Sequence, residues 1–182
     1  PLNQCEINHV SSSPDNKKII FIYRNKKPNS YSELYLYDFI KDSLECIFSG
    51  KIVSHYCWIN AEKLVVYLGK NISSQNYYIL NIKNKELSLV DNAINLNGDG
   101  HPSISPDKRW LLFDSYPNRY SVQNLYLYNN NSISTFYSFF NPYGYKGQIR
   151  CDLHPRWNSE STMICCDSPN LSGYRSMYVL WE

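Results

Sequence analysis

The side chains in this sequence that are best suited to chemistry are two histidines and one aspartate. His101 stands in the stretch GDGHPSISPDKRWLLFDS, and Asp152 and His154 stand two residues apart in QIRCDLHPRW. Residues two apart on an extended segment point to the same side, so Asp152 and His154 are expected to face one way. Two imidazoles and a carboxylate form a suitable ligand set for a divalent metal ion. The sequence therefore predicts a metal site, on the condition that the two stretches meet in the fold.

A repeated unit explains how these two stretches would meet. Each unit begins at one of the chain's four histidines, which are spaced 46, 46 and 53 residues apart: His9, His55, His101 and His154. In every unit the histidine is followed by a turn, an apolar run and a Tyr-rich run. A period in the forties that carries several short strands per unit is typical of a β-propeller. We predict an all-β fold of four-stranded antiparallel blades, roughly at residues 9–50, 55–92, 101–140 and 154–182.

The apolar run of each unit predicts a strand rather than a helix. It is short, it is bounded by turn residues, and it lies ten to twelve residues after the histidine: residues 19–21, 65–67, 111–113 and 164–166. Such runs suit strands that are buried between neighbouring sheets. In two units a Ser-Pro-Asp turn precedes the run, since Pro pre-sets φ and Asp bonds its own backbone. No segment of ten or more residues shows a sustained helical period.

The end of the last unit leaves the number of blades open. The sequence stops at Trp181-Glu182 without a fourth strand, and residues 5–8 at the chain start could supply the missing one. The preferred interpretation is that residues 1–182 form one β-propeller domain that is four blades of a larger ring. Open strand edges invite pairing with another chain. We therefore expect missing blades or a homo-oligomer to cover them.

The composition indicates which kinds of partner the protein binds and in which cellular compartment it is expected. The net charge of +2 is too small to indicate nucleic acid, and no apolar run reaches the roughly 20 residues of a membrane helix. The opening PLNQCEINHV has no signal-peptide character and no initiator Met, which predicts a processed or excised piece. The six cysteines lack C-x-x-C spacing, which indicates reduced, buried thiols. We expect a cytoplasmic protein with neither nucleic-acid nor membrane partners.

Positive and aromatic residues near the predicted metal site suit an anionic sugar. Arginine binds carboxylates bidentately, and tyrosine stacks against pyranose rings. The residues expected to bind such a ligand are Tyr145, Arg156 and Arg175. The chain has no G-x-S-x-G elbow, P-loop or dinucleotide glycine motif. A glycan or protein partner is therefore expected rather than a nucleotide.

The histidines are equally compatible with a structural role. Histidine also opens units one and two, where no second ligand is apparent. A histidine that recurs in this way is expected to bond a neighbouring blade's backbone or a turn aspartate. Asp114 and Asp167, which end the second strand of units three and four, are interpreted as turn caps rather than catalytic carboxylates.

The two stretches GDGHPSISPDKRWLLFDS and YKGQIRCDLHPRWNSESTMICCDS resemble propellers of the oligogalacturonate lyase group. That group lies within the wider WD40-like family related to TolB and the prolyl oligopeptidase propeller. The resemblance covers nearly the whole chain at the level of the repeat and is specific over residues 98–115 and 145–168. It implies one divalent metal, Mn or Ca, held by His101 and His154, with Gln148 near the position of a glutamine ligand. Asp152 stands where a further histidine would be expected, and a full-length lyase has more blades.

Three functions remain open at this point. The favoured one is a non-catalytic propeller that binds an anionic glycan or a partner and belongs to polysaccharide metabolism. In the second, a metal-dependent lyase, the metal would acidify the proton beside a uronate carboxylate and Lys146 or Arg150 would remove it. In the third, the chain is the propeller of a larger enzyme, either peptidase-like or associated with a glycosyltransferase.

Overall fold

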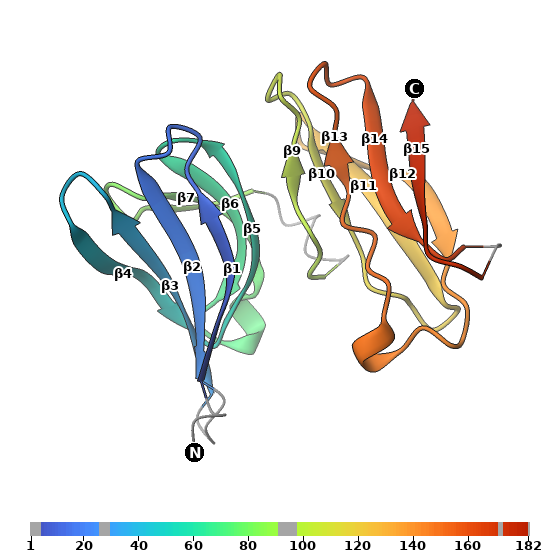
Figure 1. Ribbon diagram of the computed structural model, residues 1–182, viewed down its shortest axis with the longest axis horizontal. Helices are drawn as coiled ribbons and strands as arrows, with labels where there is room; N and C mark the ends of the chain where they lie inside the picture. The colour runs from blue at the N-terminus through green and yellow to red at the C-terminus, as the bar shows by residue number, and fades with distance from the viewer. Residues whose placement is uncertain (1–4, 26–29, 91–97, 171–172, 182) are drawn as a thin grey trace. The chain divides into compact units, whose positions relative to one another are not determined.

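The computed structural model describes residues 5–25, 30–90, 98–170 and 173–181, and these form antiparallel sheets joined by turns. This confirms the predicted all-β fold. The chain divides into two compact units, Pro1–Leu96 and Asn97–Glu182, and each holds two of the four sheets (Figure 1). No helix among the described residues is long and apolar enough to cross a membrane.

The first unit contains two four-stranded sheets, each with its strands in sequence order. The strands of one sheet are β1 (Cys5–Ser12), β2 (Lys18–Asn25), β3 (Tyr31–Asp38) and β4 (Ser43–Gly50). Those of the other are β5 (Ile52–Asn60), β6 (Lys63–Gly69), β7 (Asn76–Asn81) and β8 (Leu87–Leu89). The 3-10 turn η2 (Ile72–Ser74) links β6 to β7.

The idea that residues 5–8 complete the last sheet is wrong. These residues belong to β1, where Cys5 pairs with Asn25 and Asn8 with Ile22 of β2. The tight turn that joins β1 to β2 makes this pairing local. Local pairing needs a smaller loss of chain entropy than pairing with a strand at the far end of the chain.

The Tyr-rich runs form strands because their side chains alternate in character. In β3, Leu34 and Leu36 are buried, whereas Tyr35 and Tyr37 are half-buried on the opposite face. The leucines join the apolar core that the two sheets of the first unit share. On the other face, the Tyr35 ring stacks on Phe21 at 5.5 Å. Successive strand side chains point to opposite faces, so the leucines face the core and the tyrosines lie on the other face of the sheet.

The second unit contains one four-stranded and one three-stranded sheet. The strands of the first are β9 (Ser103–Ile104), β10 (Leu111–Asp114), β11 (Val122–Asn129) and β12 (Ser132–Phe140). Those of the second are β13 (Arg156–Trp157), β14 (Met163–Ser168) and β15 (Ser176–Trp181), and the 3-10 turn η4 (Gly147–Ile149) precedes β13. How the four sheets assemble into one propeller domain stays a prediction.

A common core joins the two sheets of the second unit and places the segments that carry the predicted site. Leu112 of β10 and Ile164 of β14 pack in one cluster with Leu153, which is fully buried between Asp152 and His154. The Trp157 indole also donates a hydrogen bond to the Ser103 carbonyl at 3.3 Å. These contacts hold the segments that lead into β9 and β13 next to each other.

Candidate metal centre

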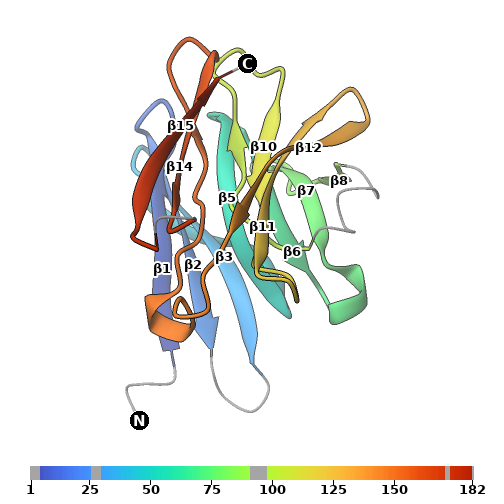
Figure 2. The ribbon, with the colours of Figure 1, turned by 90° about the vertical axis from the view of Figure 1, so that its right-hand side faces the viewer.

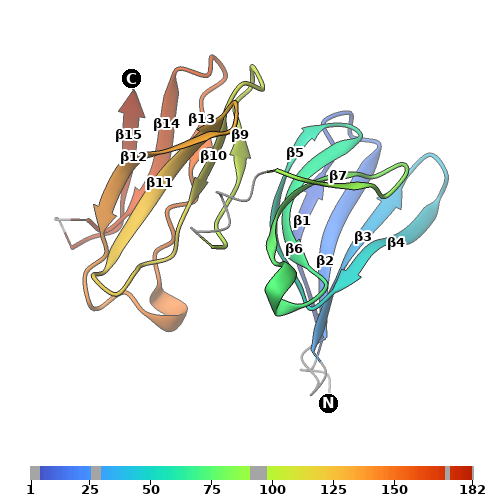
Figure 3. The same ribbon diagram turned by 180° about the vertical axis from the view of Figure 1, so that it is seen from behind.

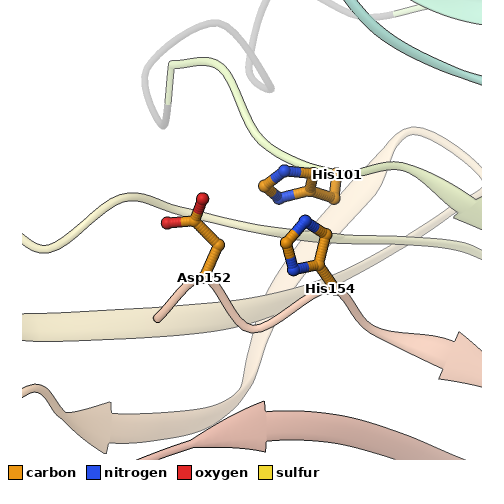
Figure 4. A group of neighbouring side chains, drawn as sticks. All are labelled: His101, Asp152 and His154. Atoms are coloured by element: carbon orange, nitrogen blue, oxygen red, sulfur yellow. The ribbon is translucent and has the colours of Figure 1, made fainter. Parts of the chain in front are cut away.

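The three predicted metal ligands come together in the second unit. His101 lies on the segment that leads into β9, and Asp152 and His154 lie on the segment that leads into β13. One possible ligand atom from each of the three lies within 4.8 Å of the other two, and Figure 4 shows the side chains pointing toward a common space. Metal–nitrogen and metal–oxygen distances of about 2 Å allow one ion to bridge donors at this separation. Their role as ligands stays a prediction.

A buried carboxylate that the sequence analysis treated as a turn cap organises this cluster. Asp114 ends β10 and is 1% exposed. It accepts the backbone N–H of His101 at 2.5 Å and that of His154 at 3.1 Å. Each of its oxygens also lies 3.0 Å from Nδ1 of His101. Asp114 therefore joins both histidine segments to the end of β10.

A pattern shared by two units marks Asp114, which the sequence analysis interpreted as a turn cap. The third and fourth units share His-Pro at the start and Asp-Ser at the end of the second strand. The Asp-Ser end of the third unit contacts the His-Pro start of both units, because Asp114 accepts the backbone N–H of His101 and of His154. The matching Asp167 donates its backbone N–H to the Leu153 carbonyl at 2.8 Å, between the two predicted ligands of that segment.

The backbone of His154 adopts an uncommon conformation. Its φ is 43°, in the left-handed region that residues other than glycine seldom occupy. The hydrogen bond to Asp114 holds the residue on one side, and the bond between Asp167 and Leu153 holds its neighbour. Strained backbone of this kind gathers at functional sites, where the surrounding structure enforces it.

The two imidazoles have opposite pKa shifts. Burial by itself lowers the pKa of His101, but the hydrogen bond and the negative charge of Asp114 outweigh burial and raise it above its usual value of 6.5. Burial, together with the charge of His101, lowers the pKa of His154 below 6.5. The two rings are close, with centroids 3.9 Å apart. At neutral pH His154 is therefore a neutral imidazole, as a metal ligand must be.

Arg150 is bound to Asp152 rather than placed as a base. Its Nε and a terminal nitrogen donate to the two carboxylate oxygens of Asp152 at 2.6 and 2.7 Å. Its guanidinium also lies 4.6 Å from the centre of the Tyr116 ring. The bond to Asp152 raises the pKa of Arg150 further above its usual value, so the group stays protonated. The predicted role of Arg150 as a proton acceptor therefore has no support in its surroundings.

Tyr145 and Arg175 make hydrogen bonds to backbone carbonyls in the loop before β15 and at the end of the η4 turn. The Tyr145 hydroxyl donates to the Gly173 carbonyl at 2.9 Å. Arg175 donates to the carbonyls of Ile149 and Arg150 at 2.5 and 3.2 Å. Both predicted ligand-binding side chains thus already make structural contacts beside the cluster.

The remaining predicted residues lie around the cluster rather than in it. Lys146 is exposed, with its ammonium 3.8 Å from the centre of the Tyr143 ring. Gln148 is exposed on η4. Arg156 is exposed on β13. The structure therefore brings His101, Asp152 and His154 together, and the role of Gln148 stays a prediction.

Arg150 lines two cavities, and one of them has residues of the cluster in its wall. One, of about 230 Å³, also contains Asp152, His154 and Arg175 in its wall. The other, of about 350 Å³, is lined by residues that include Asn141, Lys146 and Arg119. Asn141 is 5% exposed, and its side-chain oxygen has no hydrogen-bond partner among the residues that the structure describes. A buried polar atom without a partner is uncommon in folded proteins.

Comparison with known proteins shows the fold and leaves the activity open. No family model matches the chain, and no curated protein matches its sequence. TolB from Acinetobacter baumannii has a similar structure, with a TM-score of 0.67 at 15% identity over 97% of this chain and 41% of TolB. An oligogalacturonate lyase in complex with manganese has a TM-score of 0.57 at 11% identity, over 96% of this chain and 64% of the lyase.

A second oligogalacturonate lyase, from Vibrio parahaemolyticus, has a TM-score of 0.58 at 12% identity, over 97% of this chain and 66% of that protein. These similarities confirm the predicted β-propeller fold and its structural resemblance to TolB and the lyases. The chain spans less than two thirds of the length of each of these three proteins.

Proposed function

We propose that this chain binds a divalent metal ion through His101, Asp152 and His154 and thereby holds an anionic, hydroxyl-rich ligand such as an acidic glycan. The observation that carries the proposal is the contact between Asp114 and Nδ1 of His101. Histidines that ligate metals usually donate their other ring N–H to a carboxylate or carbonyl, which sets the tautomer and the ring direction. A second imidazole and a carboxylate stand within 4.8 Å of the oriented ring.

The donor set favours some metals over others. Two nitrogens and one oxygen suit Mn²⁺, Fe²⁺ or Zn²⁺, because imidazole is a good ligand for these ions. Calcium takes six to eight oxygen ligands and fits this set less well. Of the two ions that the resemblance implies, manganese is therefore the better candidate. A bound cation of this kind would attract a carboxylate oxygen of the ligand.

The bond between Arg150 and Asp152 limits how tightly the metal can bind. Both oxygens of the carboxylate accept from the guanidinium, so one of them must turn toward the metal for Asp152 to coordinate it. The positive charge of Arg150 opposes a dication but favours an anion beside it. The arrangement supports a site in which the metal and the arginine hold one anionic ligand together.

The side chains that line the 350 Å³ cavity are suited to an anionic sugar. Lys146, Arg119 and Arg150 line it, and cationic groups of this kind bind carboxylates. Tyr143 and Tyr145 also line it, and tyrosine rings stack against sugar rings. A ligand that has both carboxylates and sugar rings suits both kinds of side chain. An acidic protein segment has no sugar ring, so we favour a glycan.

We propose binding, rather than β-elimination, as the primary function. Cleavage by elimination needs a proton acceptor next to the metal. Arg150 stays protonated, and the ammonium of Lys146 lies against the Tyr143 ring. The third function, that of a propeller module within a larger enzyme, is compatible with this binding site.

The test begins with protein from which metals have been removed by a chelator. Titration calorimetry with Mn²⁺ should give one site per chain, and His154→Ala should abolish it. His9→Ala is the matched control, because His9 opens the first unit and lies outside the cluster. Absence of Mn²⁺ binding to the unaltered chain, or equal binding to His154→Ala, would refute the proposal.

The ligand is tested separately with the metal-loaded protein. Short oligogalacturonates should bind, and Lys146→Gln should weaken that binding while leaving Mn²⁺ affinity unchanged. A neutral oligosaccharide of the same length is the control, since the cationic cavity should discriminate against it. Equal affinity for the two sugars would contradict the assignment of an anionic ligand and leave the metal site intact.

A further inference from the structure

Arg150 adjoins both the predicted metal ligands and the cationic cavity. It belongs to the wall of the 230 Å³ cavity, which also contains Asp152 and His154, and to the wall of the 350 Å³ cavity, which also contains Lys146. The loop from β10 to β11 and the segment from β12 to β13, which carries Arg150, lie at the same end of the second unit (Figures 2 and 3). One guanidinium can therefore reach both a metal ligand and a bound anion.

Asp152 is a carboxylate that needs a positive partner. Its side chain is 12% exposed, whereas that of Arg150 is 44% exposed. A carboxylate that is largely removed from water needs a charged or hydrogen-bonding partner to offset the loss of hydration. Arg150 meets this need with two hydrogen bonds, one to each oxygen. A dication bound by His101 and His154 would meet it as well.

The guanidinium and a metal ion compete for this carboxylate. Because both oxygens of Asp152 accept from Arg150, coordination of a metal through either oxygen breaks at least one of the two bonds. Repulsion between the dication and the guanidinium then favours movement of Arg150 away from the metal. Arg150 is the partner that can move, since its side chain is partly exposed while Asp152 lies next to the fully buried Leu153.

Tyr116 offers the guanidinium a contact that does not involve Asp152. Its half-buried ring lies edge-on to that of His101, with centroids 6.2 Å apart and an angle of 77° between the ring planes. The Cζ atom of Arg150 lies over the Tyr116 ring, 4.6 Å from its centre. A guanidinium is attracted to the face of a tyrosine ring and keeps its N–H groups free in its own plane. Arg150 can therefore stay over Tyr116 while its N–H groups change partners.

We infer that Arg150 exchanges one carboxylate for another when the metal binds. It releases Asp152 to the metal and donates its paired N–H groups to a carboxylate of the ligand, while the Tyr116 ring holds the guanidinium in position. Tyr116 is thus a positioning residue that acts through Arg150. Metal and ligand then strengthen each other's binding by the same factor, since coupling between two sites is reciprocal.

This inference deepens the proposed function and rests on it, because it requires Asp152 to be a metal ligand. Without the exchange, Arg150 would oppose the metal only through its positive charge. With the exchange, the paired hydrogen bonds of the guanidinium matter as well, because they hold the carboxylate that the metal needs. A substitution that keeps the charge and removes the paired bonds separates the two cases.

Arg150→Lys is that substitution. In chelator-treated protein, titration calorimetry should give an Mn²⁺ affinity about tenfold higher for Arg150→Lys than for the unaltered chain. Trigalacturonate should bind Mn²⁺-loaded Arg150→Lys about tenfold more weakly, because an ammonium cannot bind a carboxylate through two parallel bonds. Arg109→Lys is the matched control, since Nε of Arg109 donates to Asp107, two residues away, at 2.6 Å. This control variant should keep both affinities.

Two variants of Tyr116 test its role. Tyr116→Phe keeps the ring and should behave like the unaltered chain. Tyr116→Leu should weaken trigalacturonate binding to the Mn²⁺-loaded protein about fivefold and leave the affinity for Mn²⁺ alone unchanged. In Arg150→Gln, which has no cation for the ring to hold, the further change Tyr116→Leu should have no effect. An additive loss in that double variant would overturn the positioning role.

The outcomes separate this inference from the proposed function. Absence of Mn²⁺ binding to the unaltered chain would refute both together. Equal Mn²⁺ affinity in the unaltered chain and in Arg150→Lys, or unchanged trigalacturonate affinity in that variant, would overturn the inference alone and leave the metal site intact. Circular dichroism reports whether each variant folds. If Arg150→Lys does not fold, Arg150→Gln takes its place, and an Mn²⁺ affinity no higher than that of the unaltered chain would then overturn the inference.

Discussion

Both carboxylate oxygens of Asp114 lie 3.0 Å from Nδ1 of His101. The same carboxylate accepts the backbone N–H of His154, 40 residues further along the chain. A carboxylate that is 1% exposed is stable only when donors surround it. The requirement to satisfy Asp114 therefore determines where both histidine segments lie.

Replacing this carboxylate should weaken metal binding without removing a ligand. In Asp114→Asn we expect Mn²⁺ affinity to fall about 10- to 100-fold, because the ring of His101 loses the partner that sets its direction and basicity. Titration calorimetry measures the change, with Asp107→Asn as a control carboxylate outside the cluster. Unchanged affinity in Asp114→Asn would show that this contact has no role in metal binding.

The two histidines should titrate on opposite sides of pH 6.5 in metal-free protein. The raised pKa of His101 means that its protonated form stabilises the fold, a contribution that is complete below pH 6.5 and lost as pH rises through the folded-state pKa. The lowered pKa of His154 has the opposite effect, so its contribution is present above pH 6.5 and lost as pH falls through its own folded-state pKa.

Imidazole chemical shifts followed by NMR across pH 4 to 9 would separate these two titrations. In Asp114→Asn the His101 midpoint should fall, because burial then acts without the hydrogen bond and the charge of Asp114. The result that contradicts this account is a His101 midpoint that does not respond to the substitution.

Gly100 should not tolerate a side chain. A Cβ at this position would lie 1.9 Å from the carbonyl oxygen of Asp114, so one of two backbone segments would have to move. Gly100→Ala should destabilise the protein by about 1–3 kcal/mol and also weaken Mn²⁺ binding. Gly144→Ala is the control, since nothing lies within 4 Å of its Cβ position. Thermal unfolding measures both, and equal melting temperatures would contradict the prediction.

Substitutions in the turn before β10 should lower the stability of the protein and leave metal binding unchanged. The buried Ser105 hydroxyl donates to Asp107 at 2.6 Å and accepts the Trp110 backbone N–H at 2.9 Å. Ser105→Ala should lower the free energy of unfolding by about 1–2 kcal/mol in urea, and Ser13→Ala, which removes the same contacts in the first unit, should act similarly. Both variants should bind Mn²⁺ normally. Loss of metal binding in Ser105→Ala alone would instead connect this turn to the site.

The strands and the faces they bury follow from local sequence. The LYLY runs in β3 and β11 place Leu34 and Leu125 in the core and tyrosines on the other face, because strand side chains alternate with a period of two. The spacing of the histidines likewise predicts that His101 and His154 open neighbouring sheets. The approach of His101, Asp152 and His154 could thus be expected from the repeat.

Other features could not be inferred in this way. The carboxylate of Asp114 binds residues 13 positions before it and 40 after it, and no local pattern specifies such partners. Arg150 and Arg175 are cations in the sequence, but their bonds to Asp152 and to the η4 carbonyls depend on how a loop folds back on itself.

The sequence by itself determined the periodic features of this protein: strand positions, buried faces and the histidine at the head of each unit. These depend on backbone geometry and on neighbours a few residues away. The tertiary structure alone decided which carboxylate orients His101 and which cations are already bound. Those depend on packing between segments far apart in the chain, where each buried polar group takes the partner that lies within reach.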